Sequence, residues 1–198
     1  MPRPSTRLLV LFAATSLLAA CSEPGRAVPS TSTTSTSARE DETYGAPRVS
    51  DPIDPREFRK SPCAVLTEAQ STGLGWEREG SASSLDSKDP YCDWDSKDGR
   101  ENYVFGWLAS NARGLADTYR ANATIADFAA YWEPTTVSGY PGVFEDGTDD
   151  RADGFCNLVV GIRDDLTFRV GASGGSGGEA CSKIKNMAEL AIKTMRGA

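Results

Sequence analysis

Histidine is missing from the 198-residue chain, and this absence excludes more chemistry than any residue present. Without an imidazole, neither a Ser-His-Asp nor a Cys-His catalytic arrangement can be assembled from the chain's own residues. Zinc sites with histidine ligands are excluded for the same reason. We therefore predict no catalytic residues, no metal ligands and no cofactor, and we expect that the protein is not an enzyme.

Basic side chains are also scarce. The chain has 21 lysines and arginines against 28 acidic residues, which gives a net charge of −7. An acidic surface does not attract the phosphate backbone of nucleic acids or the headgroups of anionic lipids. We expect no nucleic acid among the partners.

Long apolar runs are limited to residues 8–18. This run is too short for a membrane-spanning helix, which needs about 20 residues. Arg3 and Arg7 precede it and two alanines follow it, which is the order of a secretory signal peptide. We predict a signal peptide over residues 1–20.

Cys21 lies where the sequence changes from apolar to polar. The ending Leu-Ala-Ala-Cys resembles the processing site of bacterial lipoproteins, in which the cysteine thiol receives a diacylglyceryl group. We predict that Cys21 is lipidated, with acyl chains such as palmitate, and that the protein is anchored to the extracytoplasmic face of the cell membrane. The alternative is an ordinary signal peptide that happens to have a cysteine nearby.

Residues 21–45 are rich in Ser, Thr and Pro. Such a segment cannot bury enough apolar surface to offset the entropy of ordering it. We predict a disordered tether with an r.m.s. reach of roughly 25 Å. Residues 46–198 then form a single domain of ordinary size.

Four cysteines remain after Cys21: Cys63, Cys92, Cys156 and Cys181. An even number in an exported domain indicates disulfides. Three pairings are available. We favour Cys63–Cys92 with Cys156–Cys181, because each bond would join the start of a helix to a nearby strand. A zinc site of four cysteines is the competitor, but it lacks the closely spaced pair that such sites use.

Apolar periodicity predicts an α+β domain, with a mainly antiparallel sheet of five to six strands and helices packed on one face. Of the four tryptophans we expect Trp94, Trp107 and Trp132 in the core, and Trp76 is the candidate for partial exposure. The expected strands lie within residues 90–110, 138–147 and 155–173, and the expected helices at 62–73, 124–132 and 179–196.

The domain as a whole resembles a family of actinobacterial lipoproteins catalogued as domain of unknown function 3558. The resemblance implies a cell-surface anchor and two disulfides, and it brings no known activity. It is carried by the lipoprotein site at 18–21, "DPREFRKSPCAVLTEAQ" at 54–70, "CDW" at 92–94, "GYPGV" at 139–143, "CNLVVGI" at 156–162 and the later Cys181.

Our main hypothesis is a surface-anchored, non-catalytic binding domain for an unknown protein or small-molecule partner. The first alternative is a carrier of a small apolar or lipidic ligand, held in a cavity between the sheet and the helices. The second is a hydrolase of cell-wall glycan, which would need two carboxyl groups about 5–10 Å apart in a cleft.

Overall fold

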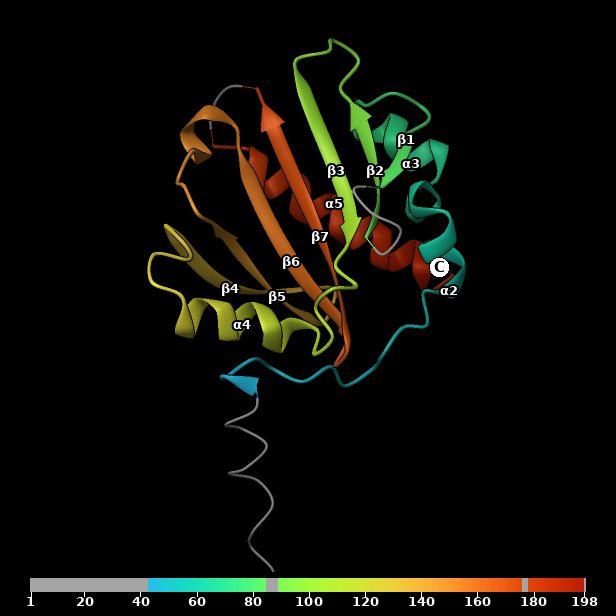
Figure 1. Ribbon diagram of the computed structural model, residues 1–198. Coiled ribbons are helices and arrows are strands. Elements are labelled where there is room, and N and C mark those ends of the chain that lie inside the picture. The colour runs from blue at the N-terminus through green and yellow to red at the C-terminus, as the bar shows by residue number, and fades with distance from the viewer. Residues whose placement is uncertain (1–42, 85–88, 176–177, 198) are drawn as a thin grey trace, which may run out of the picture. The chain divides into compact units, whose positions relative to one another are not determined.

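The computed structural model describes residues 43–84, 89–175 and 178–197. The predicted signal peptide, Cys21 and the tether as far as residue 42 lie outside the described residues. Within the described ranges, seven strands form one antiparallel sheet in the order β1-β2-β3-β7-β6-β5-β4 (Figure 1). The expected count of five to six strands is therefore wrong, although the antiparallel α+β class is confirmed.

The elements follow one another along the chain with short connections. The helical elements are α2 (Arg56–Lys60), η1 (Pro62–Val65), α3 (Glu68–Gly73), α4 (Leu115–Thr124), η2 (Arg151–Asp153) and α5 (Ala180–Met195). The strands are β1 (Ser81–Ser84), β2 (Pro90–Asp95), β3 (Glu101–Trp107), β4 (Tyr131–Val137), β5 (Tyr140–Asp146), β6 (Cys156–Arg163) and β7 (Leu166–Gly174).

The two edge strands are the ones that the sequence pattern missed. Strand β1 contains only small residues, so it carries no apolar alternation that could reveal it. A helix was expected at 124–132, but α4 ends at 124 and β4 begins at 131, so that prediction is wrong. Helix α4 ends at Thr124, and the following Ile125 is 56% exposed instead of buried. The aromatic start of β4 pairs with β5, and this tertiary pairing overrides the helix-like spacing.

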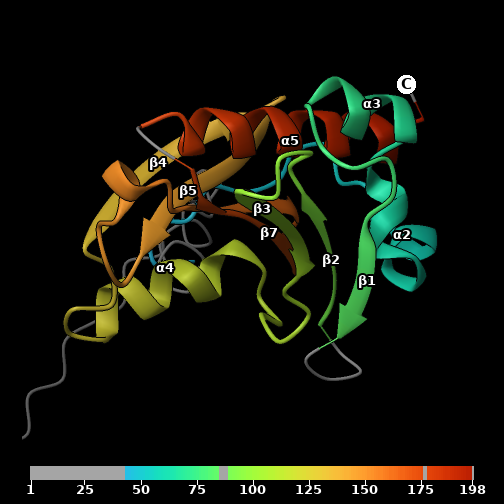
Figure 2. The same ribbon diagram turned by 90° about the horizontal axis from the view of Figure 1, so that it is seen from above.

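Helices cover both faces of the sheet, so the expectation of helices on one face is also wrong. Helices α5 and α3 lie on one side and α4 lies on the other (Figure 2). We call these sides the α5 face and the α4 face.

The α5 face holds the main core. Phe105 of β3 is fully buried; its ring stacks on Phe168 with centroids 4.8 Å apart and meets Trp107 edge-on. Helix α5 contributes Ile184 and Met187, which are equally buried. The space between the sheet and α5 is therefore filled by side chains.

Trp76 belongs to this core, which contradicts its expected exposure. It is 2% exposed and stacks on Tyr103 with ring centroids 4.1 Å apart, because the chain at Trp76 forms a bridge to Ser96 beside the sheet. Trp94 and Trp107 are buried as expected. Trp132 is only half-buried, and it packs edge-on against Tyr119 of α4 on the other face.

The short helices before the sheet follow their sequence signals. Thr67 accepts a hydrogen bond from the backbone N–H of Gln70, whose side chain accepts one from the Thr67 N–H. This capping box fixes the start of α3. At the end of the chain, α5 matches the expected terminal helix closely.

The α4 face is covered over part of its width. Leu115 of α4 packs with Val143 of β5 and Val159 of β6 in a small second cluster. Gly161 allows this close approach, because a Cβ there would lie 3.3 Å from the Leu115 Cβ. The same face of β2, β3 and β7 has no helix over it within the described residues (Figure 1).

Candidate functional site

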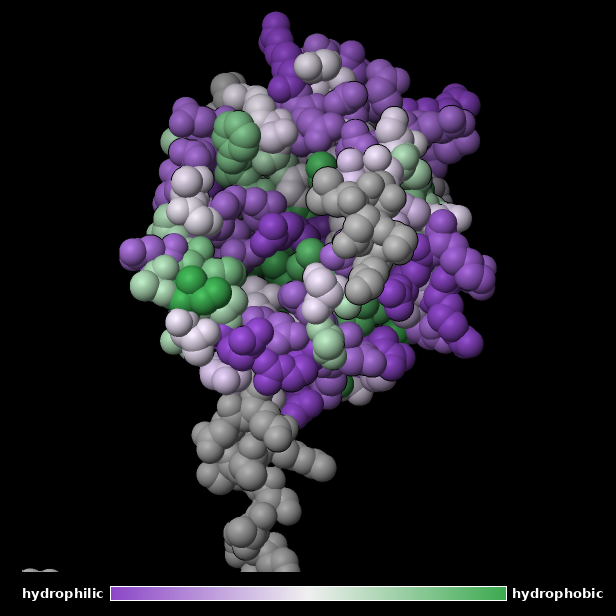
Figure 3. Space-filling view, in the orientation of Figure 1, coloured by the Kyte–Doolittle hydropathy of each residue, from purple (hydrophilic) through white to green (hydrophobic). Residues whose placement is uncertain are grey.

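An open groove lies on the α4 face beside helix α4. Its volume is about 530 Å³, which is within the usual range of ligand sites of roughly 300–1,000 Å³. Strands β2, β3 and β7 supply most of its walls, and Phe155 and Asn157 complete them. Figure 3 shows the hollow in the middle of this face, with apolar side chains at its bottom.

The floor of the groove is formed by residues of two neighbouring strands, and two of these residues are glycines. Val104 and Gly106 of β3 lie opposite Gly171 and Arg169 of β7. Gly171 has a packing reason, because a Cβ there would lie 2.6 Å from the Asn157 Oδ1. Gly106 has no such packing reason. Among the described residues, only the Tyr91 Cβ would lie within 4 Å of a Cβ added at Gly106, at 3.5 Å.

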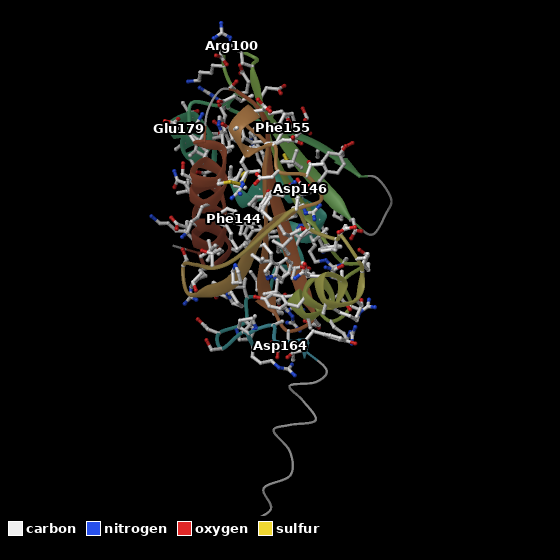
Figure 4. The ribbon with its side chains drawn as sticks, turned by 90° about the vertical axis from the view of Figure 1, so that its left-hand side faces the viewer. Arg100, Phe144, Asp146, Phe155, Asp164 and Glu179 are labelled. Atoms are coloured by element: carbon white, nitrogen blue, oxygen red, sulfur yellow. A yellow bond between two sulfur atoms is a disulfide. The ribbon has the colours of Figure 1, made fainter. Side chains whose placement is uncertain are left out.

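Apolar side chains form the rim. Phe155, just before β6, is 45% exposed, and Tyr91 and Leu108 are partly buried on the other walls. Figure 4 shows Phe155 on the side of the sheet away from α5, whereas Phe144 points toward the helix. The rim and floor together present mainly apolar surface.

Three polar residues of the groove bond to side chains outside its lining or to the backbone. Arg169 pairs with Glu145, whose side chain is 3% exposed. Asn157 donates to the Asp146 carboxylate. Asp89 accepts hydrogen bonds from the backbone N–H groups of Ala109 and Ser110, at 2.6 and 3.3 Å from its Oδ1.

A second hollow of about 390 Å³ lies at the β6–β7 turn and is lined mainly by charged residues. Arg163 donates to Asp165 at 2.8 Å, and this bond holds the pKa of the Asp165 carboxyl below its ordinary value. Arg56 pairs with Asp54 in the same way, through exposed side chains. Exposed ion pairs of this kind stabilise a fold little, and most of the charge in this hollow is already paired.

A third cluster joins β3 to α5. The Lys183 Nζ lies 2.7 and 2.9 Å from the two Glu101 carboxylate oxygens, and the Tyr103 hydroxyl donates to the same carboxylate. Burial, together with that bond, raises the pKa of Tyr103 to about 12. The bond to Lys183 lowers the pKa of Glu101. These groups satisfy one another and hold α5 on the sheet.

The cysteines lie away from the groove. The structure joins Cys63 to Cys92 and Cys156 to Cys181, with Cα–Cα distances of 5.0 and 5.3 Å. This is the pairing that the sequence analysis favours. The first bond ties η1 to β2 and the second ties α5 to β6, so both secure the α5 face.

Two further findings concern the described residues only. No group of three or more His, Cys, Asp or Glu side chains is placed to hold a metal ion within those ranges. Nor does any helix in them have the length and apolarity needed to cross a membrane.

The groove was not predicted. The signal that could have found it is weak: Gly106 and Gly171 interrupt two otherwise strong strands, and a strand glycine often marks a place where another group approaches the backbone closely. Without the register of β3 on β7, these glycines could not be placed near each other, diagonally across the ladder.

Comparison with known proteins identifies the family. Residues 16–194 match the family described as a protein of unknown function (DUF3558), and the chain belongs to this family. This match confirms the resemblance to domain of unknown function 3558, and the lipid anchor that the resemblance implies stays a prediction. Neither a curated protein nor a solved structure matches the chain.

Proposed function

We propose that this protein is a lipid-anchored, extracytoplasmic binding domain that holds its partner or ligand, without catalysis, in the groove on the α4 face. The amino-terminal pattern ending at Cys21 supports the anchor. The two disulfides suit an oxidising compartment outside the cytoplasm.

The bare floor at Gly106 is the observation that carries the proposal. A glycine inside a strand weakens the strand, because it has more freedom to lose and no side chain to pack. Gly161 on the same face is explained by the approach of Leu115, whereas no described residue comes close enough to require Gly106. A ligand lying on the strand would explain it.

Binding without catalysis fits the groups that line the groove. The chain has no histidine, and Asp89 is the one carboxylate among the described lining residues. A glycan hydrolase that uses two carboxyl groups flanking the bond would need a second acid in the cleft.

The size of the groove favours a small-molecule carrier as the second candidate function. We expected a carrier to hold its ligand between the sheet and the helices, but that layer is filled on the α5 face. The groove on the α4 face offers the space instead.

Site-specific cross-linking on living cells tests the binding site. We would place p-benzoylphenylalanine at Tyr91 on the rim, with Asn186 on the exposed side of α5 as the matched control position. We expect an ultraviolet-dependent adduct from position 91 and none from 186. The adduct should disappear with Gly106→Leu, which fills the floor, and persist with Gly106→Ala. The same adducts from both positions, or none from 91, would contradict the proposal.

Mass spectrometry of the full chain tests the anchor separately. Cys21→Ala should leave the chain uncleaved and without the mass of a diacylglyceryl group, whereas Ser22→Ala should be processed and lipidated. A wild-type chain that carries no lipid would refute this part of the proposal.

A further inference from the structure

Resting on the proposed function, we infer that the ligand of the groove is an uncharged, largely apolar small molecule whose carbonyl or ester oxygen accepts a hydrogen bond from Arg169. The inference combines the shape of the floor, the charge balance of the walls and the spare donors of one guanidinium.

The floor favours a thin, apolar part of the ligand. Gly106 leaves the backbone of β3 uncovered, and Gly171 of β7 lies diagonally across the ladder, opposite Val104. Tyr91 and Phe155 stand on opposite walls and add apolar surface. A hydrocarbon chain or a flat ring can lie on such a floor and remove this apolar surface from water.

Both charged groups of the walls already have hydrogen-bond partners. Only Asp89 and Arg169 are charged among the described lining residues. Asp89 accepts from two backbone N–H groups, and Arg169 is paired with the buried Glu145. A charged group on the ligand would lose its hydration without gaining a free counter-ion, which is costly. The groove therefore selects against both acids and amines.

Arg169 supplies the polar contact. A guanidinium has five N–H donors, and Glu145 is its one hydrogen-bond partner among the described residues. Its Nε is buried without a partner, but its side chain is 43% exposed toward the groove. A neutral oxygen can therefore accept from an outer nitrogen and form a charge-assisted hydrogen bond without adding charge.

Three probes that share a ten-carbon chain test the inference. We would titrate methyl decanoate, decanoate and decylamine into the full chain carrying Cys21→Ala, so that no attached lipid competes, and follow the NMR signals of Gly106 and Arg169. We expect the ester to bind more than about ten-fold tighter than the acid or the amine, which corresponds to one strong polar interaction.

Variants separate the contributions of the floor and of Arg169. Gly106→Leu should weaken ester binding more than about ten-fold, whereas Gly106→Ala should change it little. Arg169→Met combined with Glu145→Met removes both charges together, so no charge is left buried alone. This double variant should bind the ester about ten-fold more weakly. Thermal unfolding of each variant checks that it is folded.

The outcomes distinguish the inference from the function on which it rests. Equal or tighter binding of decanoate or decylamine would overturn the uncharged ligand but leave the groove as a binding site. No binding of any probe, together with a protein cross-linked from position 91 in cells, would also overturn the uncharged ligand. It would leave the groove as the binding site of a macromolecular partner. No probe binding and no adduct from position 91 would overturn both.

Discussion

The two faces of the same sheet are covered to different extents. On the α5 face, strands β3, β6 and β7 lie under a sixteen-residue helix that a disulfide bonds to the sheet. On the α4 face, the ten-residue helix α4 covers β5 and β6 and leaves β3 and β7 open. One face is therefore a core, and the other is partly a core and partly an open groove.

The difference follows from which side chains alternate along β3. Tyr103, Phe105 and Trp107 point to the α5 face and are buried. Val104 and Gly106 point to the other face and remain partly exposed. The contrast teaches that one strand can provide stability on one side and an accessible surface on the other. This is possible because successive side chains of a strand point to opposite faces of the sheet.

The largest difference in stability should be between two truncations at adjacent residues of β3 that face opposite sides of the sheet. Phe105→Ala should lower the free energy of unfolding by about 4 kcal/mol, because it leaves a cavity among buried rings. Val104→Ala should cost less than about 1 kcal/mol, because the groove is open to water there. Urea denaturation measures both. Equal costs would mean that the α4 face is as tightly packed as the α5 face.

Removing a disulfide should affect the α5 face selectively. Cys156→Ser with Cys181→Ser should destabilise the domain by about 3 kcal/mol, because the bond closes a loop of 25 residues. The Cys63–Cys92 bond closes a similar loop of 29 residues, so Cys63→Ser with Cys92→Ser should cost a similar amount. Hydrogen exchange should accelerate in α5 and not in α4 for the first pair. Acceleration in α4 alone would contradict the division into two faces.

Two of the glycines on the α4 face provide a smaller contrast. Gly161→Val should cost about 2 kcal/mol, because the new side chain would push against Leu115 of α4. Gly106→Val should change stability by less than about 0.5 kcal/mol, since its Cβ meets only an ordinary contact and valine favours strands. Thermal unfolding compares the pair. A large loss at position 106 would show that the groove floor is packed.

The smallest effect concerns the pH dependence of the α5 face. The folded-state pKa of Glu101 is lowered, so the stability it adds is present above its unfolded pKa of about 4.3 and is lost as the pH falls through the folded value. Glu101→Gln should therefore cost about 1 kcal/mol at pH 7, because the partner Lys183 is partly exposed and the pair is screened by water. The difference from wild type should shrink below about pH 4.

A matched control sharpens that measurement. Glu77 is exposed, and its side chain bonds to no described residue. With Glu77→Gln, the free energy of unfolding should fall at acid pH in the same way as it does in the wild type. A cost for Glu101→Gln that stays constant between pH 7 and 3 would contradict the role given to the carboxylate.

Five of the seven strands and the terminal helix could be predicted from the sequence, because each carries its own apolar period. The hairpin of β6 and β7 and the helix α5 are the clearest cases. The edge strand β1 has no apolar period. The stretch before β4 has a helix-like apolar spacing, which wrongly predicts a helix. The groove could not be predicted because it depends on the register between strands, which sequence spacing does not report.

The sequence alone determined which histidine-dependent chemistry is excluded, which family the chain belongs to and which residues can form a core. These features depend on composition and local order. The tertiary structure decided which residue lies opposite each glycine and which aromatic rings are buried. It also decided that one helix leaves half of a sheet face uncovered. These features arise from contacts between segments distant in the chain, where packing outweighs local preference.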